Sequence, residues 1–141
     1  MEKKGFIVDR TDATKAFVDY MSEHGQTAQV LNALTDGYGG PYDMIYANAV
    51  LVHFTSRQIV KVLRRAHKSL KHDGLFSFSV KIGDGTSWSN AKLNLPRFFV
   101  YWREQPLRDL LSEAHFDVVF WKESKTGHNS ENWYHVIARR L

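Results

Sequence analysis

The sequence predicts an α/β fold, in which helices cover a mostly parallel sheet, and two observations support this class. Segments with strand patterns alternate with segments of helical periodicity, which is typical of parallel strands joined by helical crossovers. Apolar residues make up 43% of the 141 residues, which is enough for a packed core and argues against disorder. We therefore expect a single domain over residues 1–141.

The first 31 residues are predicted to form a helix between two strands. The helix is expected over residues 15–24, with Thr14 as its N-cap and Gly25 at its end. A glycine-rich loop is expected over residues 35–41. The two strands are expected at Phe6–Thr11 and Thr27–Leu31.

The middle of the chain has the clearest strand and helix patterns. Residues 42–47 are predicted to form a strand. Thr55 and Gln58 have the spacing of a capping box, so a helix is expected to begin there and to run to about Leu70. Its apolar residues recur at helical spacing and are expected to face the core: Ile59, Val62, Leu63, Ala66 and Leu70.

The second half is predicted to hold three strands and one helix. Phe76, Phe78 and Val80 alternate with serines, which indicates a strand over residues 75–81 with one apolar face. A polar loop is expected next. The expected segments are a loop over 82–96, a helix over 104–114, strands at Phe116–Trp121 and Trp133–Arg139, and an exposed loop over 123–131.

The composition excludes several classes of function. The chain has no cysteine, which excludes disulfides, thiolate metal sites and cysteine nucleophiles. No histidine has the helical spacing of a metal ligand beside a suitable Glu, so no metal is expected. The net charge of +4 is mild, and the basic residues of 57–68 are explained more simply by a solvated helix face than by nucleic-acid binding. With no signal peptide and no long apolar run, we expect a cytoplasmic protein that binds no membrane.

Six segments match, in order, the motifs of one enzyme family. Residues 42–53 match its fourth strand, and residues 63–76 match the helix and turn that follow. The other matching segments are Phe6–Thr14, Ser79–Gly85, Arg97–Tyr101 and Asn132–Arg140. The chain thus resembles the small class I S-adenosylmethionine-dependent methyltransferases over essentially its whole length. The resemblance implies a Rossmann-like methyltransferase sheet with an antiparallel last strand, and S-adenosylmethionine as the cofactor.

By this resemblance, three residues are expected to bind the cofactor. Asp12 lies where the family has an acidic residue that binds the ribose, and Asn32 and Ala33 lie where the family contacts adenine. A carboxylate at the end of a strand can accept hydrogen bonds from two hydroxyls. The alternatives are that Asp12 is a turn or helix-capping residue and that Asn32 is a plain turn residue.

The same resemblance implies residues for catalysis and for the substrate. Asn48 and His53 lie near the family's methyl-transfer centre and are predicted to be catalytic, although packing or capping is the alternative role for His53. Lys81, Arg97 and Tyr101 lie near the substrate mouth and are predicted to bind a small-molecule substrate, with structural roles as the alternative.

The resemblance does not extend to the family's first strand and its glycine-rich cofactor loop. Residues 3–6 already resemble the end of the helix that follows this loop, so the domain is predicted to be N-terminally truncated. In the family the first strand lies between the second and the fourth, so its loss leaves unpaired backbone groups, which are costly when buried. The flanking strands could pair directly, or a homodimer or a complementing chain could cover them, and we expect the homodimer.

Two functions follow from these expectations. The first is methyl transfer from S-adenosylmethionine to a small molecule, with weak cofactor binding. The second is a catalytically inactive methyltransferase fold that serves as an interaction or regulatory module, and a folded fragment without function is a third possibility. Likeness of fold alone does not choose among them.

Overall fold

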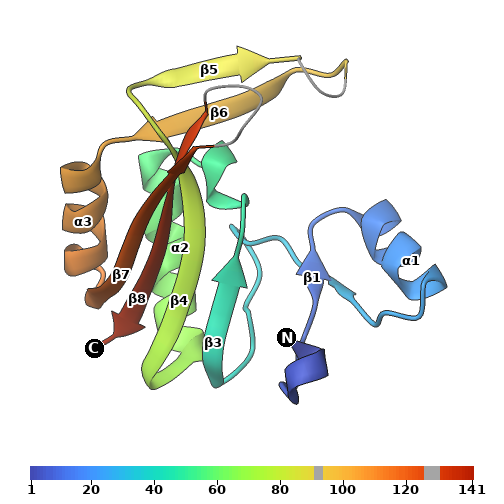
Figure 1. The fold of residues 1–141 in the computed structure, drawn as a ribbon. Coiled ribbons are helices and arrows are strands. Elements are labelled where there is room, and N and C mark those ends of the chain that lie inside the picture. The colour runs from blue at the N-terminus through green and yellow to red at the C-terminus, as the bar shows by residue number, and fades with distance from the viewer. Residues whose placement is uncertain (91–93, 126–130) are drawn as a thin grey trace. The chain divides into compact units, whose positions relative to one another are not determined.

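The computed structural model of the protein describes residues 1–90, 94–125 and 131–141. The chain divides into two compact units, Met1–Tyr38 and Gly39–Leu141 (Figure 1). That the two act as one domain remains a prediction. No helix in the described part of the chain is long and apolar enough to cross a membrane.

The unit Met1–Tyr38 holds a parallel pair of short strands joined by a helix. Its elements are η1 (Glu2–Lys4), β1 (Thr11–Asp12), α1 (Lys15–Glu23) and β2 (Gln29–Val30). The helix is confirmed, but the strands predicted at 6–11 and 27–31 are too long. Among the described residues β1 pairs with β2 alone. In the described structure Phe6 and Ile7 belong to no strand. Both are exposed, Ile7 fully so at 101%.

The unit Gly39–Leu141 is built on a mixed sheet of six strands. They are β3 (Tyr42–Ala47), β4 (Leu70–Ile82), β5 (Thr86–Ser89), β6 (Arg97–Trp102), β7 (Phe116–Lys125) and β8 (Asn132–Arg140). β4 is the central strand, with β3 and β6 parallel to it and β8 antiparallel. β8 is also antiparallel to β7. The predicted α/β class with an antiparallel last strand is therefore confirmed.

Helices cover this sheet through the apolar faces that the sequence predicts (Figure 1). α2 (Ser56–Ser69) begins with the predicted capping box, in which Thr55 Oγ1 accepts from the Gln58 N–H and Gln58 Oε1 accepts from the Thr55 N–H. All five residues of its predicted apolar face are buried. The other helices are η2 (Leu51–His53) and α3 (Glu104–Glu113), and α3 buries Leu107 and Leu111.

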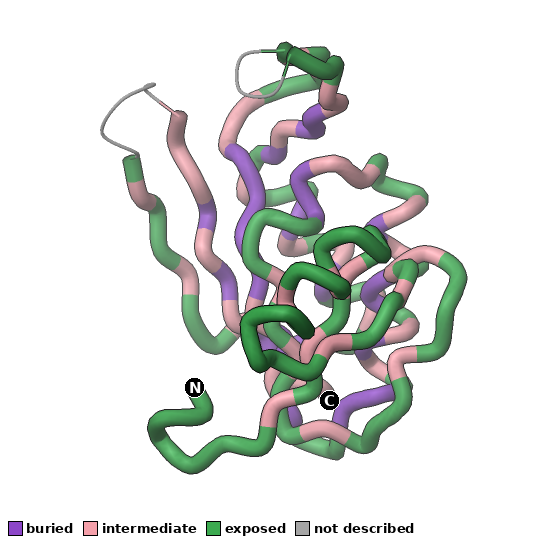
Figure 2. Tube along the Cα trace, turned by 90° about the vertical axis from the view of Figure 1, so that its right-hand side faces the viewer, coloured by how far each residue is buried: buried purple, intermediate pink, exposed green. Residues whose placement is uncertain are grey.

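The buried residues of the chain all belong to this second unit (Figure 2). Phe76, Phe78 and Val80 form the apolar face predicted for β4 and are at most 2% exposed. In contrast, Met1–Tyr38 contains no buried residue. Phe17 and Tyr20 of α1 are half-exposed.

The predicted loop over residues 82–96 is wrong, because part of it forms a strand. β5 pairs antiparallel with β6, and Trp88 packs against Phe98 with ring centroids 5.3 Å apart. The sequence of β5 is polar because the hairpin lies at the edge of the sheet, where an apolar face is not required. Residues 91–93 lie outside the described part of the chain.

Two other predicted boundaries are also wrong. β4 begins at Leu70 instead of Leu75, since Tyr42 of β3 pairs with Leu70 before a shift in register. β7 extends to Lys125 because it remains paired with β8 as far as Asn132, so the first residues of the predicted loop over 123–131 are strand. Residues 126–130 lie outside the described part.

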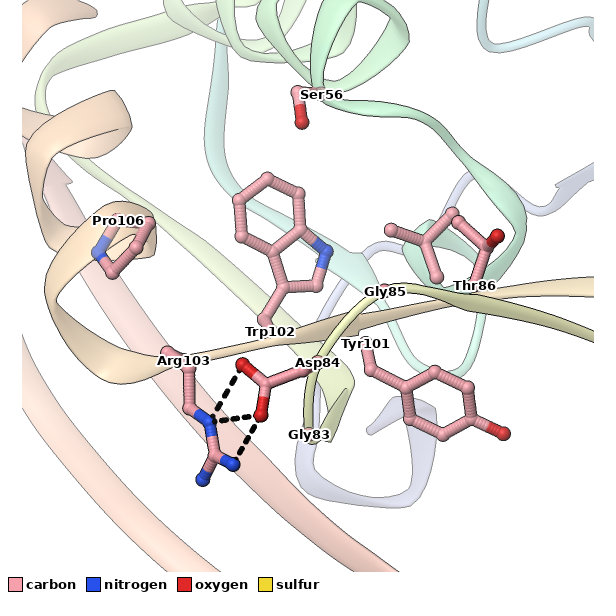
Figure 3. A pocket seen from close by; sticks show the side chains of 10 residues that line it. Ser56, Gly83, Asp84, Gly85, Thr86, Tyr101, Trp102, Arg103 and Pro106 are labelled. Atoms are coloured by element: carbon pink, nitrogen blue, oxygen red, sulfur yellow. Dashed lines mark hydrogen bonds and ion pairs between the residues drawn. The ribbon is translucent and has the colours of Figure 1, made fainter.

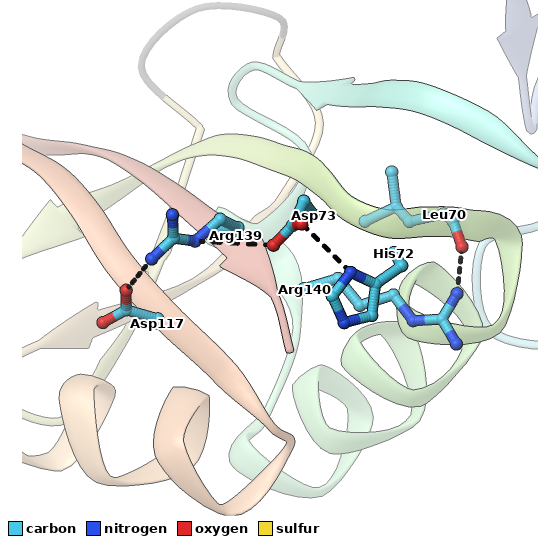
Figure 4. Close-up of polar contacts among 6 residues, drawn as sticks. All are labelled: Leu70, His72, Asp73, Asp117, Arg139 and Arg140. Atoms are coloured by element: carbon cyan, nitrogen blue, oxygen red, sulfur yellow. Dashed lines mark hydrogen bonds and ion pairs between the residues drawn. The ribbon is translucent and has the colours of Figure 1, made fainter.

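Polar side chains at the amino end of β4 pair with one another (Figure 4). Arg139 binds Asp117 at 2.8 Å and Asp73 at 4.0 Å, and His72 contacts Asp73 at 3.0 Å. The Arg140 guanidinium donates to the backbone oxygen of Leu70. The ion pairs of this cluster are exposed, so each contributes little to stability.

Candidate functional site

The carboxyl ends of β3 and β4 lie at one edge of the sheet, because the two strands are parallel. The chain leaves β3 through Asn48 and Ala49, and β4 ends with Lys81 and Ile82. Open α/β sheets bind ligands at this edge. The residues predicted for catalysis and those predicted for substrate binding therefore come from segments that meet in space.

A buried serine fixes the turn after β3. Ser79 Oγ donates to Asn48 Oδ1 and accepts from the Ala49 N–H, both at 2.8 Å. Ala49 has a φ of 55°, in the left-handed region that non-glycine residues rarely adopt. The two hydrogen bonds hold this strained turn and orient the Asn48 side chain.

A cavity of about 240 Å³ lies at the same edge. It brings together the predicted residues His53, Lys81, Arg97 and Tyr101. The complete lining is Ala49, Val52, His53, Lys81, Ser89, Arg97, Phe99, Tyr101, Glu131 and Trp133. Asn48 precedes a lining residue but is not itself part of the lining.

Lys81 is a buried cation, 6% exposed, within this cavity. Its Nζ donates to Glu131 Oε1 at 2.7 Å and lies 3.8 Å from the Phe99 ring centroid and 5.6 Å from that of Trp133. Burying a charge is costly unless it is paired. Glu131 and the two rings supply this compensation, so the ammonium group is held in one place.

His53 is oriented by the backbone of β6. Its Nδ1 lies 2.7 Å from the Phe98 carbonyl oxygen, and its ring packs against Phe99 at 4.9 Å. A carbonyl oxygen can only accept, so Nδ1 carries the hydrogen. In the neutral imidazole Nε2 is then an acceptor that can take a proton.

Arg97 and Tyr101 enter the cavity from β6. The Arg97 guanidinium carbon lies 5.3 Å from the Phe99 centroid, and its Nε is buried with no acceptor among the described residues. The Tyr101 hydroxyl lies 2.9 Å from Ser87 Oγ of β5. The β5–β6 hairpin therefore positions both predicted substrate-binding residues.

A second, shallower cavity of about 290 Å³ lies at the turn between β4 and β5 (Figure 3). Arg103 Nε donates to both oxygens of Asp84 at 3.0 Å, and this hydrogen bonding lowers the pKa of the Asp84 carboxyl and raises that of Arg103. The buried Trp102 indole lies between Ser56 and Pro106. The predicted catalytic residues Asn48 and His53 do not line this cavity. Tyr101, which was predicted to bind substrate, lines both cavities.

The residues predicted for the cofactor lie at the carboxyl ends of β1 and β2. Asp12 ends β1, and its Oδ1 accepts from the Thr14 N–H at 2.8 Å, while Thr14 itself makes no capping bond with its side chain. Asn32 Oδ1 accepts from the Leu34 N–H at 2.9 Å, and the Ala33 carbonyl accepts from the Tyr38 hydroxyl at 2.6 Å. Both loops are thus fixed by their own hydrogen bonds.

These residues are compatible with part of an adenosyl site. One carboxylate oxygen of Asp12 is used in the turn, which leaves Oδ2 to accept a hydroxyl hydrogen bond. The Asn32 amide oxygen is engaged, so its NH₂ group is the part that can meet a ligand. No cluster of His, Asp or Glu that could hold a metal ion occurs in the described ranges.

Sequence reasoning missed Ser79, Glu131, Phe99 and Trp133. Ser79 lies in a matched motif but was expected on the polar face of its strand, whereas it is 1% exposed. The Lys81–Glu131 pair joins positions 50 residues apart, and no spacing rule links them. Nothing in the sequence distinguishes Phe99 and Trp133, which line the cavity, from aromatic residues of the core.

Replacing Ser79 by Ala is expected to lower the free energy of unfolding by about 1–3 kcal/mol, since the Ala49 N–H and Asn48 Oδ1 lose their buried partner. Ser77→Ala on the same face of β4 is the matched control, since Ser77 is only half-buried, and should change stability by less than about 0.5 kcal/mol. Urea denaturation measures both variants. Equal effects would show that the turn does not depend on Ser79.

Solved structures of methyltransferases are similar to this chain. No family model matches the sequence, and no curated protein matches it in sequence. A SAM-dependent methyltransferase from Methanosarcina mazei superposes with a TM-score of 0.85 at 13% identity, covering 98% of this chain and 84% of that one.

Two further similar structures contain bound S-adenosylhomocysteine. The 1,6-didemethyltoxoflavin-N1-methyltransferase of Burkholderia thailandensis, solved with S-adenosylhomocysteine, gives a TM-score of 0.78 at 20% identity over 99% of this chain and 64% of that one. The magnesium protoporphyrin IX methyltransferase of Synechocystis, also with S-adenosylhomocysteine, gives 0.72 at 14% identity over 99% and 66%. The chain thus spans less than two thirds of each of these two enzymes. At these identities the likeness establishes the architecture, and this chain has the fold of the S-adenosylmethionine-dependent methyltransferases.

Proposed function

We propose that the protein binds S-adenosylmethionine and transfers its methyl group to a small molecule held in the cavity beside His53. The observation that carries this proposal is the meeting of His53, Lys81, Arg97 and Tyr101 in one cavity at the carboxyl edge of the sheet. Such an edge is where α/β folds of this kind bind ligands.

The cofactor would be held through the edge formed by β1 and β2. Asp12 Oδ2 would accept a ribose hydroxyl, and Asn32 and Ala33 would contact adenine. S-adenosylmethionine supplies a methyl group on a positively charged sulfur, which makes that carbon open to attack by a nucleophile.

The protein's own contribution would be positioning and proton transfer. With the cofactor bound, methyl transfer to an O–H or N–H of the acceptor would require that group to give up its proton. His53 Nε2 is the acceptor for this proton, because Nδ1–H is committed to the Phe98 carbonyl. Asn48, fixed by Ser79, would orient the reactants.

The alternative function, an inactive interaction or regulatory module, gains no support from the structural neighbours, which are named as methyltransferases.

The cofactor site is tested by calorimetry with S-adenosylmethionine. Asp12→Asn keeps an oxygen for the Thr14 turn but loses the charge, and removal of a charge-assisted hydrogen bond is expected to weaken binding by about 1.5–3 kcal/mol, roughly ten- to hundredfold.

Asp19→Asn is the matched control for Asp12→Asn. Asp19 lies on α1 and pairs with the exposed Lys15, so this variant should bind as the parent does. If the Asp12→Asn protein binds the cofactor as tightly as the parent, Asp12 has no role in the site.

We also propose that the protein is a homodimer whose interface includes the open edge of β3. In the described part of the chain, β3 pairs with β4 alone, and its Tyr46 is 58% exposed. The unit Met1–Tyr38 has no buried residue, so a dimer interface could also bury its exposed apolar side chains. Unpaired strand edges of this kind recruit further strands.

Light scattering at micromolar concentration should give twice the chain mass of 16.3 kDa. Tyr46→Lys should shift the protein towards monomer, whereas Trp88→Lys on the exposed strand β5 should not. A well-folded monomer of the parent at this concentration would rule out the dimer.

A further inference from the structure

We infer that the methyl acceptor is a small organic carboxylate with a flat, largely apolar body that also carries the O–H or N–H to be methylated, bound in the cavity between Arg97 and Lys81. This inference rests on the proposed function, and it adds the chemical class of the acceptor. It follows from the charges, the hydrogen-bond donors and the walls of the cavity.

Two cations share one aromatic ring in this cavity. Lys81 Nζ lies 3.8 Å and the Arg97 guanidinium carbon 5.3 Å from the Phe99 centroid. Two positive charges beside one ring favour a negative charge nearby.

Among the described residues that line the cavity, one carboxylate faces these two cations. Glu131 lies 2.7 Å from Lys81 Nζ, and among the lining side chains it is the acidic one. Lys81, Arg97 and Glu131 together carry one net positive charge. A ligand with one negative charge balances it, whereas a phosphate monoester carries about −1.5 to −2 at neutral pH.

Two buried N–H donors of the lining also have no acceptor in the described part of the protein. They are Arg97 Nε and Trp133 Nε1. Buried donors are almost always paired, and the planar guanidinium matches the two oxygens of a carboxylate. The Arg97 side is therefore where the anionic group would bind.

The walls and the size of the cavity define the rest of the ligand. Phe99, Tyr101 and Trp133 present rings, and Val52 is apolar, which favours a flat apolar body. The volume of about 240 Å³ is below the roughly 300–1,000 Å³ of pockets that hold drug-sized ligands. The acceptor is thus a small, single-ring molecule.

The test is an NMR titration of the ¹⁵N-labelled full chain with benzoate, benzamide and inorganic phosphate, without cofactor. Benzoate should shift the Arg97 Nε–H and Trp133 indole N–H signals in a saturable way. Benzamide has the same shape without the charge and should bind at least tenfold more weakly, as should phosphate.

Arg97→Gln should weaken benzoate binding at least tenfold. Arg64→Gln, an exposed arginine of α2 outside the lining, is the matched control and should bind benzoate as the parent does. The dispersion of the amide spectrum shows whether each variant is folded, and the comparison of benzoate with benzamide on the parent chain does not depend on any variant.

Equal binding of benzoate and benzamide, tighter binding of phosphate than of benzoate, or an unchanged Arg97→Gln protein would overturn the inference. Because the titration contains no cofactor, it is separate from the test of the function. Benzoate binding without S-adenosylmethionine binding would contradict the methyltransferase proposal and support the carboxylate site. S-adenosylmethionine binding without benzoate binding would contradict the carboxylate site and support the cofactor site.

Discussion

The parallel pairing of β3 with β4 is the constraint on which the candidate site depends. It brings the ends of both strands to one edge, so that Asn48 from β3 and Ser79 and Lys81 from β4 lie together. Ser79 and Lys81 are two residues apart and share a face of the strand. Ser79 fixes the turn that leaves β3, and Lys81 provides a charge in the cavity beside it.

The buried lysine explains why the surrounding residues are arranged as they are. An ammonium group removed from water needs a counter-charge and polarisable neighbours, and these come from distant segments. Glu131 precedes β8, Phe99 belongs to β6 and Trp133 belongs to β8. The cavity therefore exists only when β4, β6 and β8 are assembled, which makes it a property of the folded sheet and not of any single motif.

The sequence predicted the elements that have strong local signals. The β3 strand and α2 with its capping box are found where they were expected, and so is the apolar face of Phe76, Phe78 and Val80. β5 was missed because this edge strand is polar, and β1 is shorter than predicted because pairing, not composition, decides where a strand ends.

The candidate site was predicted in its residues but not in its contacts. The resemblance implied a place near the methyl-transfer centre for His53 and near the substrate mouth for Lys81, Arg97 and Tyr101. The structure brings all four into one cavity. Their partners, such as the Phe98 carbonyl for His53 and Glu131 for Lys81, depend on tertiary packing between distant positions, so periodicity and spacing could not reveal them.

The proposed cofactor site is tested most directly by an NMR titration of the ¹⁵N-labelled chain with S-adenosylhomocysteine, because this method detects weak binding. Saturable shifts are expected for the backbone signals of Asp12, Asn32 and Ala33 at the edge of β1 and β2. No saturable shift at millimolar ligand, or shifts confined to other parts of the chain, would contradict the proposed site.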